Sequence, residues 1–195
     1  MSTTPKIILA STSSFRKALL EKLHLPFITA SPETDETRLD NETAESLVLR
    51  LAKAKALAVA DNQSGIIIGS DQVAVVDGKI IGKPLSRDKA IEQLKSQSGK
   101  TITFYTGLAV FDTASQHMQA EVEPFHVTFR KLTQAEIEAY VDAEEPWYCA
   151  GSFKSEGLGI TLFDKLQGRD PNTLIGLPLI LLCEYLRKLG LQLPA

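Results

Sequence analysis

The segment Ile66–Pro84, IIIGSDQVAVVDGKIIGKP, decides the fold that we expect for this chain. It begins with Ile66–Ile68, a β-branched apolar run that is too short for a helix and is flanked by glycines. Such a run predicts a buried strand. The run stops at a Gly-Ser pair, and Asp71 and Gln72 follow at once. We therefore expect a carboxylate and an amide at the end of a buried strand.

A hairpin is predicted directly after this strand. Val73–Val76 and Lys79–Ile81 flank an Asp-Gly pair, which is typical of a two-residue type I′ turn. Because the arms of a hairpin run antiparallel, we expect Lys83 to return toward Asp71. An acid and a cation at a strand end suit an active site, but they suit a surface ion pair equally well.

Composition limits the class of protein. The chain has 195 residues and a hydrophobic content of 44%, enough for one buried domain over residues 1–195 with two lobes. The formal net charge of −3 gives no basic field, so no nucleic-acid partner is expected. Cys149 and Cys183 lie far apart and outside any metal-ligand spacing, which argues against structural zinc and disulfides.

The sequence gives no sign of targeting to a membrane. The N-terminal MSTTPKIILASTS has too short an apolar core for a signal peptide. The longest apolar run, Leu174–Cys183, falls well short of the roughly 20 residues that a membrane span requires. We expect a cytoplasmic, reduced protein without a membrane partner.

A loop rich in hydroxyls follows the first expected strand, Lys6–Ala10. It contains Ser11 and Ser13 and leads into a helix with Arg16 in its first turn. Hydroxyls and backbone N–H groups at a helix start can hold a phosphate. The alternative is that a serine simply caps the helix. A cation in the first turn opposes the helix dipole, which favours the anion-binding interpretation.

An acidic loop and a long helix come next. Residues 31–41 carry four carboxylates and are either a solvated loop or part of a Mg²⁺ site that phosphates complete. Thr43 is expected to open a helix that runs to about Ala60, with Ala54 and Ala58 on its buried stripe. Nothing local distinguishes Lys55 from the other cations of this helix. The carboxylates of the loop are Glu33, Asp35, Glu36 and Asp40.

The second half of the chain predicts an antiparallel strand pair and three further helices. Strands are expected at 101–111 and 122–130, a glycine-rich loop at 149–159, and a turn at 170–172. Helices are expected after Ser86, from a Thr133–Glu136 capping box to about Asp142, and from Pro178 to Gly190. The alternation of strands and helices in the first half predicts an α/β fold: a mixed sheet with flanking helices.

Familiar catalytic motifs are absent from the sequence. The segment GKIIGK at Gly78–Lys83 is one residue short of a P-loop, and Pro84 stands where a hydroxyl would bind Mg²⁺. The three histidines show no arrangement with a nucleophile. The remaining serine-arginine loop, acidic loop, Asp71, Lys83 and glycine-rich loop fit metal-assisted attack of water on a phosphoanhydride.

Six motifs, in order, resemble the Maf family of nucleotide pyrophosphatases over about Ile7 to Leu189. They are LASTSSFRK (9–17), RLAKAKA (50–56), GSDQ…GKP (69–84), FYTG (104–107), AGSFKSEGLG (150–159) and DPNTLIGLPL (170–179). The last two resemble the YceF-type branch, which hydrolyses 7-methyl-GTP. The chain departs from the family pattern at Ser14, where proline is usual, and at Lys17, where arginine is common.

The resemblance implies an elongated α/β fold of the Maf/Ham1, ITPase-like kind, with two lobes around a cleft. It also implies hydrolysis of a nucleoside triphosphate between the α- and β-phosphates with a divalent cation, Mg²⁺, Mn²⁺ or Co²⁺. By this resemblance Asp71 accepts the proton. The catalytic residues expected are Arg16, Lys55, Asp71 and Lys83; the metal ligands are Glu36 and Asp71; the substrate-binding residues are Ser11, Ser13, Phe15, Gln72, Lys154 and Glu156.

The chemistry of two of these side chains suits a methylated guanine. N7 methylation gives the ring a positive charge, which an aromatic face such as that of Phe15 attracts. The Glu156 carboxylate only accepts hydrogen bonds, and the guanine edge offers two adjacent donors. The alternative for Glu156 is an ion pair with Lys154. Two other functions stay open: the same hydrolysis of dTTP or UTP, and a nucleotide-binding regulator of cell division. The partner expected is the nucleotide, and a homodimer stays open.

Overall fold

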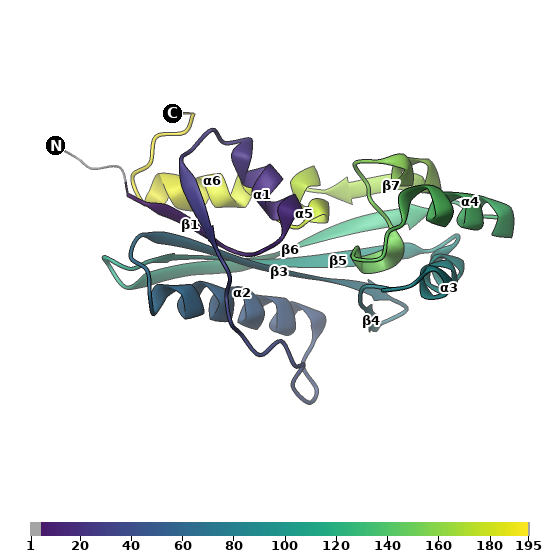
Figure 1. Ribbon diagram of the computed structural model, residues 1–195, viewed down its shortest axis with the longest axis horizontal. Coiled ribbons are helices and arrows are strands. Elements are labelled where there is room, and N and C mark those ends of the chain that lie inside the picture. Colours follow the sequence, from purple (N-terminus) through teal and green to yellow (C-terminus); the bar gives the residue numbers. More distant parts are fainter. Residues whose placement is uncertain (1–4, 195) are drawn as a thin grey trace. The chain divides into compact units, whose positions relative to one another are not determined.

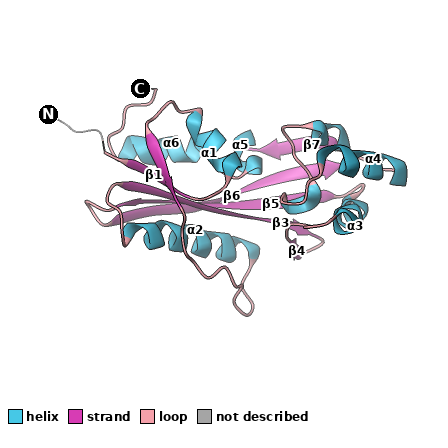
Figure 2. Ribbon diagram, viewed as in Figure 1, coloured by secondary structure: helices cyan, strands magenta, loops and turns pink. Residues whose placement is uncertain are grey.

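The computed structural model describes residues 5–194, and in these residues the fold is a mixed α/β sheet with flanking helices (Figures 1 and 2). The strand order is β2-β1-β3-β5-β6-β7, and β4 pairs with β3. The strands are β1 (Ile7–Ala10), β2 (Phe27–Ala30), β3 (Ile66–Val76), β4 (Lys79–Ile81), β5 (Thr101–Asp112), β6 (His117–Phe129) and β7 (Phe163–Gly168). The helices are α1 (Ser14–Glu21), α2 (Ala44–Ala60), α3 (Arg87–Gln97), α4 (Gln134–Glu144), α5 (Pro171–Ile175) and α6 (Leu179–Lys188), with 3-10 turns at Ala150–Ser152 and Leu158–Leu162.

The chain divides into two compact units. The first contains the chain up to Asp71, Thr106–Glu123, and the chain from Asp170 onward. The second contains Gln72–Tyr105 and Pro124–Arg169. The cleft between two lobes that the sequence predicts stays a prediction, as does the single-domain organisation.

The first unit is a three-layer arrangement around parallel strands. β1 pairs in parallel with both β2 and β3, with Ile7 opposite Phe27 on one side and Ile66 on the other. Because strand side chains alternate between faces, Ile66 and Ile68 pack with α1 and α6, whereas Ile67 packs with α2. Figure 1 shows these helices on opposite faces of the strands. The parallel strands and the covering helices confirm the α/β prediction.

Two glycines let α2 approach the sheet closely. A Cβ atom at Gly69 of β3 would stand 2.2 Å from the carbonyl oxygen of Ala52, and one at Gly107 of β5 would stand 2.3 Å from that of Val48. Real side chains do not tolerate such distances. Glycine inside a strand often marks such a close approach of two backbones. The prediction that β3 stops at Gly69 is therefore wrong, because this glycine is required for packing and the strand runs on to Val76.

The predicted hairpin is confirmed. Ala74–Val76 pairs with Lys79–Ile81 in the antiparallel sense. The turn residues Asp77 and Gly78 have φ values of 49° and 76°, as a type I′ turn requires. Lys83 lies two residues beyond the paired segment. Since Lys83 and Asp71 belong to different units, their approach stays a prediction.

The second unit packs around a cluster of aromatic rings. Phe104, Phe129, Phe153 and Phe163 meet edge to face, with ring centroids 4.8–5.5 Å apart. Such edge-to-face pairs add stability beyond the apolar area that they bury. The pairing of β6 with β7 is antiparallel and brings Phe163 opposite Phe129. The cluster thus ties the glycine-rich loop, which carries Phe153, to the strands of this unit.

The helix starts that the sequence indicates are confirmed, whereas one strand was not predicted and the prediction of one turn is wrong. Thr43, Ser86 and Thr133 cap α2, α3 and α4, and the Thr133–Glu136 capping box is complete. The sequence did not predict β7. The segment 170–172, predicted as a turn, instead starts the short helix α5, which Asp170 caps.

Among the described residues, no helix combines the length and the apolar character that crossing a membrane requires. Part of the N-terminal segment considered for a signal peptide, residues 1–4, lies outside the described residues.

Candidate active site

The serine loop at the end of β1 makes its own capping contacts. The backbone N–H of Ser13 donates to the Ser11 hydroxyl at 3.1 Å, and Ser13 Oγ accepts from the backbone N–H of Arg16 at 3.4 Å. Ser13 is therefore the N-cap of α1, as the alternative interpretation expected. Phosphate binding by Ser11 and Ser13 stays a prediction. Phe15, in the same turn, leaves 37% of its surface exposed.

Arg16 is held in a half-buried position next to the acidic groups of the first unit. Its Nε donates to the carbonyl oxygen of Gly176 at 2.9 Å. Burial lowers the pKa of Arg16, while the negative charges of Asp71 and Glu36 oppose this shift. An arginine stays protonated under ordinary conditions. The side chain thus supplies a fixed positive charge close to two carboxylates.

Lys55 joins those two carboxylates. Its Nζ lies 2.7 Å from Asp71 Oδ1 and 2.7 Å from Glu36 Oε1. Lys55 and Asp71 are only 7% and 8% exposed, whereas the Glu36 side chain is 61% exposed. Lysine and aspartate are seldom buried unless they are paired. The arrangement concentrates one cation and two anions where α2 crosses β3.

The sequence carried a local signal for Lys55 that our reading missed. The buried residues of α2 recur at helical spacing, and Lys55 is one turn from both Leu51 and Val59 on that stripe. Ala54 and Ala58, which we expected on the stripe, are only half-buried. A lysine on the buried stripe of a helix is the pattern that would have identified it.

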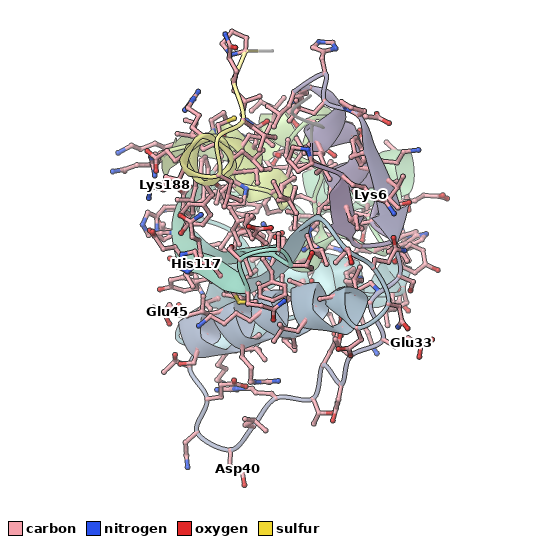
Figure 3. All side chains as sticks on the ribbon, turned by 90° about the vertical axis from the view of Figure 1, so that its left-hand side faces the viewer. Lys6, Glu33, Asp40, Glu45, His117 and Lys188 are labelled. Carbon is pink, nitrogen blue, oxygen red and sulfur yellow. The ribbon has the colours of Figure 1, made fainter. Side chains whose placement is uncertain are left out.

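The acidic loop separates into outward and inward carboxylates. Figure 3 shows Glu33 and Asp40 pointing away from the ribbon. Asp35 Oδ1 accepts from the backbone N–H of Thr37, a local turn contact. Glu36, through Lys55, is the loop carboxylate that reaches β3.

A second charged pair, which the sequence reading did not single out, fastens this loop to α2. Both carboxylate oxygens of Glu42 accept from Arg50, at 2.6 and 2.9 Å. The hydrogen bonds from Arg50 lower the pKa of Glu42 to about 2. Arg50 also donates to the carbonyl oxygen of Thr37 at 3.0 Å, directly beyond Glu36. Paired arginine–carboxylate contacts fix geometry as well as charge.

The donor set at Glu36 and Asp71 fits a divalent cation that phosphates help to bind. Two carboxylates converge on one point, the ammonium of Lys55. No cluster of three or more His, Cys, Asp or Glu side chains suited to a metal occurs in residues 5–194. Mg²⁺ is commonly held by one or two carboxylates together with water and substrate phosphates. Glu36 and Asp71 could therefore supply two ligands of a divalent cation whose other ligands come from outside the protein.

Three predicted site residues, Lys83, Lys154 and Glu156, belong to the second unit. Cys149 is half-buried, and burial raises the pKa of its thiol. The positive charges of Lys154 and Lys83 oppose this shift, and the negative charge of Glu156 adds to it. Among the described residues, Lys154 pairs with Glu144 and not with Glu156: its Nζ lies 3.6 Å from Glu144 Oε2. The ion-pair alternative for Glu156 therefore finds no support.

The first unit thus brings together Arg16, Glu36, Lys55 and Asp71, while Lys83, Lys154 and Glu156 belong to the second unit. Gln72, half-buried, follows Asp71 along β3. Two residues that were not predicted from the sequence adjoin the first group: Gly176 contacts Arg16, and Ser70 contacts Gly176.

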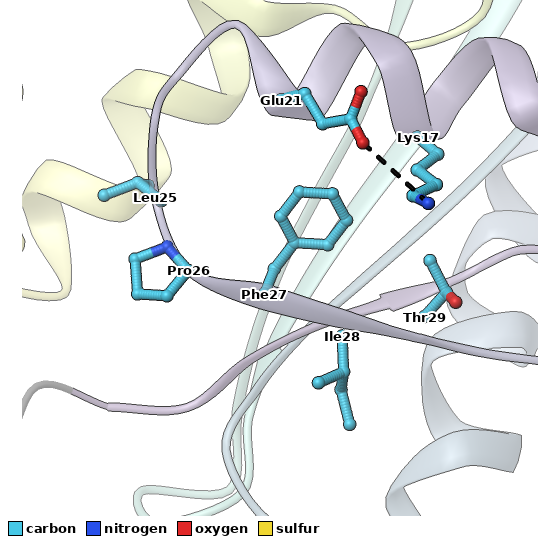
Figure 4. Close-up of a pocket in the computed structure, with 7 residues that line it drawn as sticks. All are labelled: Lys17, Glu21, Leu25, Pro26, Phe27, Ile28 and Thr29. Atoms are coloured by element: carbon cyan, nitrogen blue, oxygen red, sulfur yellow. Dashed lines mark ion pairs between the residues drawn. The ribbon is translucent and has the colours of Figure 1, made fainter.

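One open pocket of the first unit lies elsewhere. It has a volume of about 530 Å³, lies between α1 and β2, and holds none of the predicted site residues (Figure 4). An exposed ion pair between Lys17 and Glu21, at 3.9 Å, crosses one side of it. Its wall otherwise consists of Leu25, Pro26, Phe27, Ile28 and Thr29.

The family model described as Maf, Maf-like protein, matches residues 6–189. The structure of the Staphylococcus aureus Ham1 protein is similar at a TM-score of 0.54 and 15% identity, covering 94% of this chain and 98% of that one. This likeness supports a fold of the Maf/Ham1 kind.

Two further solved structures are more distant in shape. A nucleoside-triphosphatase, described as a dITP/XTP pyrophosphatase, from Mycobacterium abscessus has a TM-score of 0.45 and 15% identity over 97% of this chain and 100% of that one. A HAM1 protein from Coxiella burnetii has a TM-score of 0.46 and 15% identity over 78% and 89% of the two chains.

Proposed function

The chain belongs to the Maf-like protein family over residues 6–189, and from this premise we propose that it is a nucleoside triphosphate pyrophosphatase. The substrate proposed is 7-methyl-GTP, cleaved to 7-methyl-GMP and diphosphate. The observation that carries the proposal is the buried Lys55, whose ammonium lies 2.7 Å from both Asp71 and Glu36. A cytoplasmic location would suit an enzyme that removes a modified nucleotide from the pool.

The proposed chemistry assigns a separate task to each charged group. Asp71 accepts the proton of the attacking water, since a carboxylate at the site is a suitable general base. Arg16, Lys55 and Lys83 neutralise the triphosphate, whose charge shifts toward the leaving diphosphate as the bond breaks. A divalent cation bound by Glu36 and Asp71 would add further neutralisation of phosphate charge.

Lys55 is suited to respond to the substrate. In the present structure its ammonium already satisfies two carboxylates. A triphosphate with its metal brings both new anions for Lys55 and a new cation for the carboxylates. Lys55 and the two carboxylates therefore have partners of opposite charge both before and after binding, which limits the cost of burying these groups.

The assignment of the base rests on Phe15 and Glu156. Phe15 is partly exposed and thus accessible to a ligand, and an exposed aromatic face attracts a cation by about 0.5–1 kcal/mol. Glu156 is exposed, and its Oε2 accepts a long 3.4 Å hydrogen bond from the Ser155 hydroxyl. These features support recognition of a positively charged ring with two donors on its edge.

The test is a screen for diphosphate release. The protein is incubated with 7-methyl-GTP, GTP, dTTP or UTP, with Mg²⁺, Mn²⁺ or Co²⁺, and with a chelator as control. We expect 7-methyl-GTP to give the highest kcat/KM, and we expect the chelator to abolish release. A preference for dTTP or UTP would move the substrate assignment to the alternative. Tight nucleotide binding with no release would favour a regulator.

A further inference from the structure

The segment DPNTLIGLPL at Asp170–Leu179 has no task in the chemistry described so far, yet it contacts the site. Its residue Gly176 ends α5, and the carbonyl oxygen of Gly176 accepts two hydrogen bonds. One comes from Arg16 Nε and the other from the Ser70 hydroxyl, each at 2.9 Å. A carbonyl oxygen has two lone pairs, so both of its acceptor positions are used.

Gly176 is placed so that only glycine fits. Its φ of +125° is a conformation that side-chain-bearing residues rarely adopt. A Cβ atom there would meet Arg16 Nε at 3.4 Å and the Arg16 stem at 3.8 Å. The backbone of Gly176 therefore lies directly against the arginine side chain.

The helix α5 that presents this carbonyl is fastened at both ends. Asp170 is buried and accepts from the backbone N–H groups of Asn172 and Ile180, which joins the starts of α5 and α6. The backbone carbonyl oxygen of Thr173 accepts a hydrogen bond from the Thr106 hydroxyl at 2.9 Å. The carbonyl of Gly176 thus has a fixed place relative to β3 and β5 in the first unit.

Ser70 and Asp71 are neighbours on β3, so their side chains point to opposite faces of the sheet. Asp71 meets Lys55 of α2 on one face, and Ser70 meets Gly176 on the other. β3 thus contacts one cation on each face. Asp71 binds Lys55 directly, and Ser70 binds the Gly176 carbonyl that also accepts from Arg16.

We propose that Ser70 and the Gly176 carbonyl form a positioning element that orients the Arg16 guanidinium for the triphosphate. Binding of Nε to Gly176 fixes the plane of the guanidinium and leaves its two terminal nitrogens to contact phosphate. Ser70 keeps the shared acceptor in place. The expected effect on kcat/KM rests on the proposed function. The expected effect on the position of the Arg16 side chain does not.

The structure offers a matched control for Ser70. Thr106 is also fully buried, and its hydroxyl also donates at 2.9 Å to a carbonyl oxygen of the α5 segment. That carbonyl belongs to Thr173, whereas Arg16 binds the carbonyl of Gly176. Ser70→Ala and Thr106→Val each remove one buried hydroxyl, and only the former removes a donor that shares its acceptor with Arg16.

The structural test follows the Arg16 Nε–H by ¹⁵N NMR, with the resonance assigned from its loss in Arg16→Lys. We expect Ser70→Ala to shift this resonance and to accelerate its exchange with solvent at least threefold, a rough estimate for one lost neighbouring hydrogen bond. Thr106→Val should change both less than Ser70→Ala does, because its hydroxyl binds α5 at Thr173 and not at the carbonyl that Arg16 uses. Equal effects of the two substitutions, or no effect of Ser70→Ala, would overturn the proposal whether or not the protein hydrolyses a nucleotide.

The kinetic test uses a double-mutant cycle with 7-methyl-GTP. Ser70→Ala should lower kcat/KM about tenfold in the native background, because a misplaced binding group costs up to about 10²-fold. In the Arg16→Lys background the same substitution should cost less than about twofold, because a lysine side chain has no guanidinium Nε–H to position. Thr106→Val should keep kcat/KM within about twofold of wild type. An equal loss in both backgrounds would show a general structural role and reject the proposal. Absence of release by wild-type protein on every nucleotide would instead reject the proposed function.

Discussion

At the scale of single residues, burial decides which charged groups can act. Asp71 is nearly buried and pairs with Lys55, whereas Asp142 forms a similar pair with Arg87 on the surface. Surface ion pairs contribute little to stability, about 0–1 kcal/mol at most. A buried pair is kept where geometry or chemistry demands it. The contrast between these two aspartates permits a direct test.

Asp71→Asn should abolish most of the hydrolysis and leave the fold intact. Asparagine keeps an oxygen that can accept from Lys55 but cannot accept a proton from water, so kcat should fall by roughly 10²–10⁴-fold. The measurement is kcat with 7-methyl-GTP, together with the thermal midpoint. Asp142→Asn is the matched control and should leave kcat unchanged. If Asp71→Asn has a kcat close to that of wild type, Asp71 is not the general base.

The proposed recognition of the base can be tested with two substitutions that act on different parts of the ring. Glu156→Gln places an amide donor near the donors of guanine, and should lower kcat/KM for 7-methyl-GTP and GTP alike by about 10- to 100-fold. Phe15→Leu removes the aromatic face, and should narrow the gap between the two nucleotides while changing the GTP value little. If Phe15→Leu lowers kcat/KM equally for both nucleotides, the aromatic ring of Phe15 only packs against its neighbours and does not sense the charge of the base.

At the scale of elements, helix starts were the most predictable feature. The Thr133–Glu136 pattern indicated a capping box, and the structure has both of its hydrogen bonds. The reason is physical: the first backbone N–H groups of a helix need acceptors, and few side chains can supply them. Such a signal is local in sequence and needs no knowledge of the rest of the fold.

Thr133→Ala tests how much this cap contributes. Loss of an N-cap acceptor should lower the free energy of unfolding by about 0.5–2 kcal/mol. Gln134→Ala, at the next and exposed position, is the control and should change it by less than about 0.5 kcal/mol. Urea titration followed by circular dichroism measures both. Neither substitution should alter kcat, since the side-chain hydrogen bonds of both residues stay within the start of α4.

Elements that depend on distant partners were not predictable in the same way. β7 has the sequence FDKLQG, with mostly exposed side chains and no apolar alternation, and its pairing with β6 is what makes it a strand. Gly69 looked like a strand end because its reason for being glycine is the backbone of α2, which lies elsewhere in the sequence. The link from Ser70 to Arg16 also passes through Gly176, more than a hundred residues away. Local patterns cannot contain such contacts.

At the scale of the whole molecule, the two units share strands. β3, β5 and β6 each have residues in both units, since the divisions fall at 71/72, 105/106 and 123/124. If one of these strands loses its hydrogen-bonded pairing in one unit, its pairing in the other unit is therefore weakened as well. We expect the two units to unfold in one cooperative transition, as small domains usually do.

Two carboxylates, one in each unit, allow this cooperativity to be tested. Glu42 in the first unit and Glu136 in the second each have a pKa lowered from 4.5 to about 2, the former by hydrogen bonds from Arg50 and the latter by hydrogen bonds from Thr133. A carboxylate with a lowered pKa in the folded state stabilises the fold above its ordinary pKa. That stabilisation is lost as the pH falls from 4.5 toward 2.

Glu42→Gln should therefore destabilise the protein at pH 7, with a loss that shrinks as the pH falls toward about 2. The probe is the fluorescence of Trp147, the single tryptophan of the chain, which lies in the second unit. If unfolding is cooperative, this substitution in the first unit shifts the urea midpoint that Trp147 reports, and hydrogen exchange in α2 and α4 changes together. Glu136→Gln provides the comparison within the second unit. An unchanged Trp147 midpoint in Glu42→Gln, with α2 exchanging faster, would show that the units unfold separately despite the strands that they share.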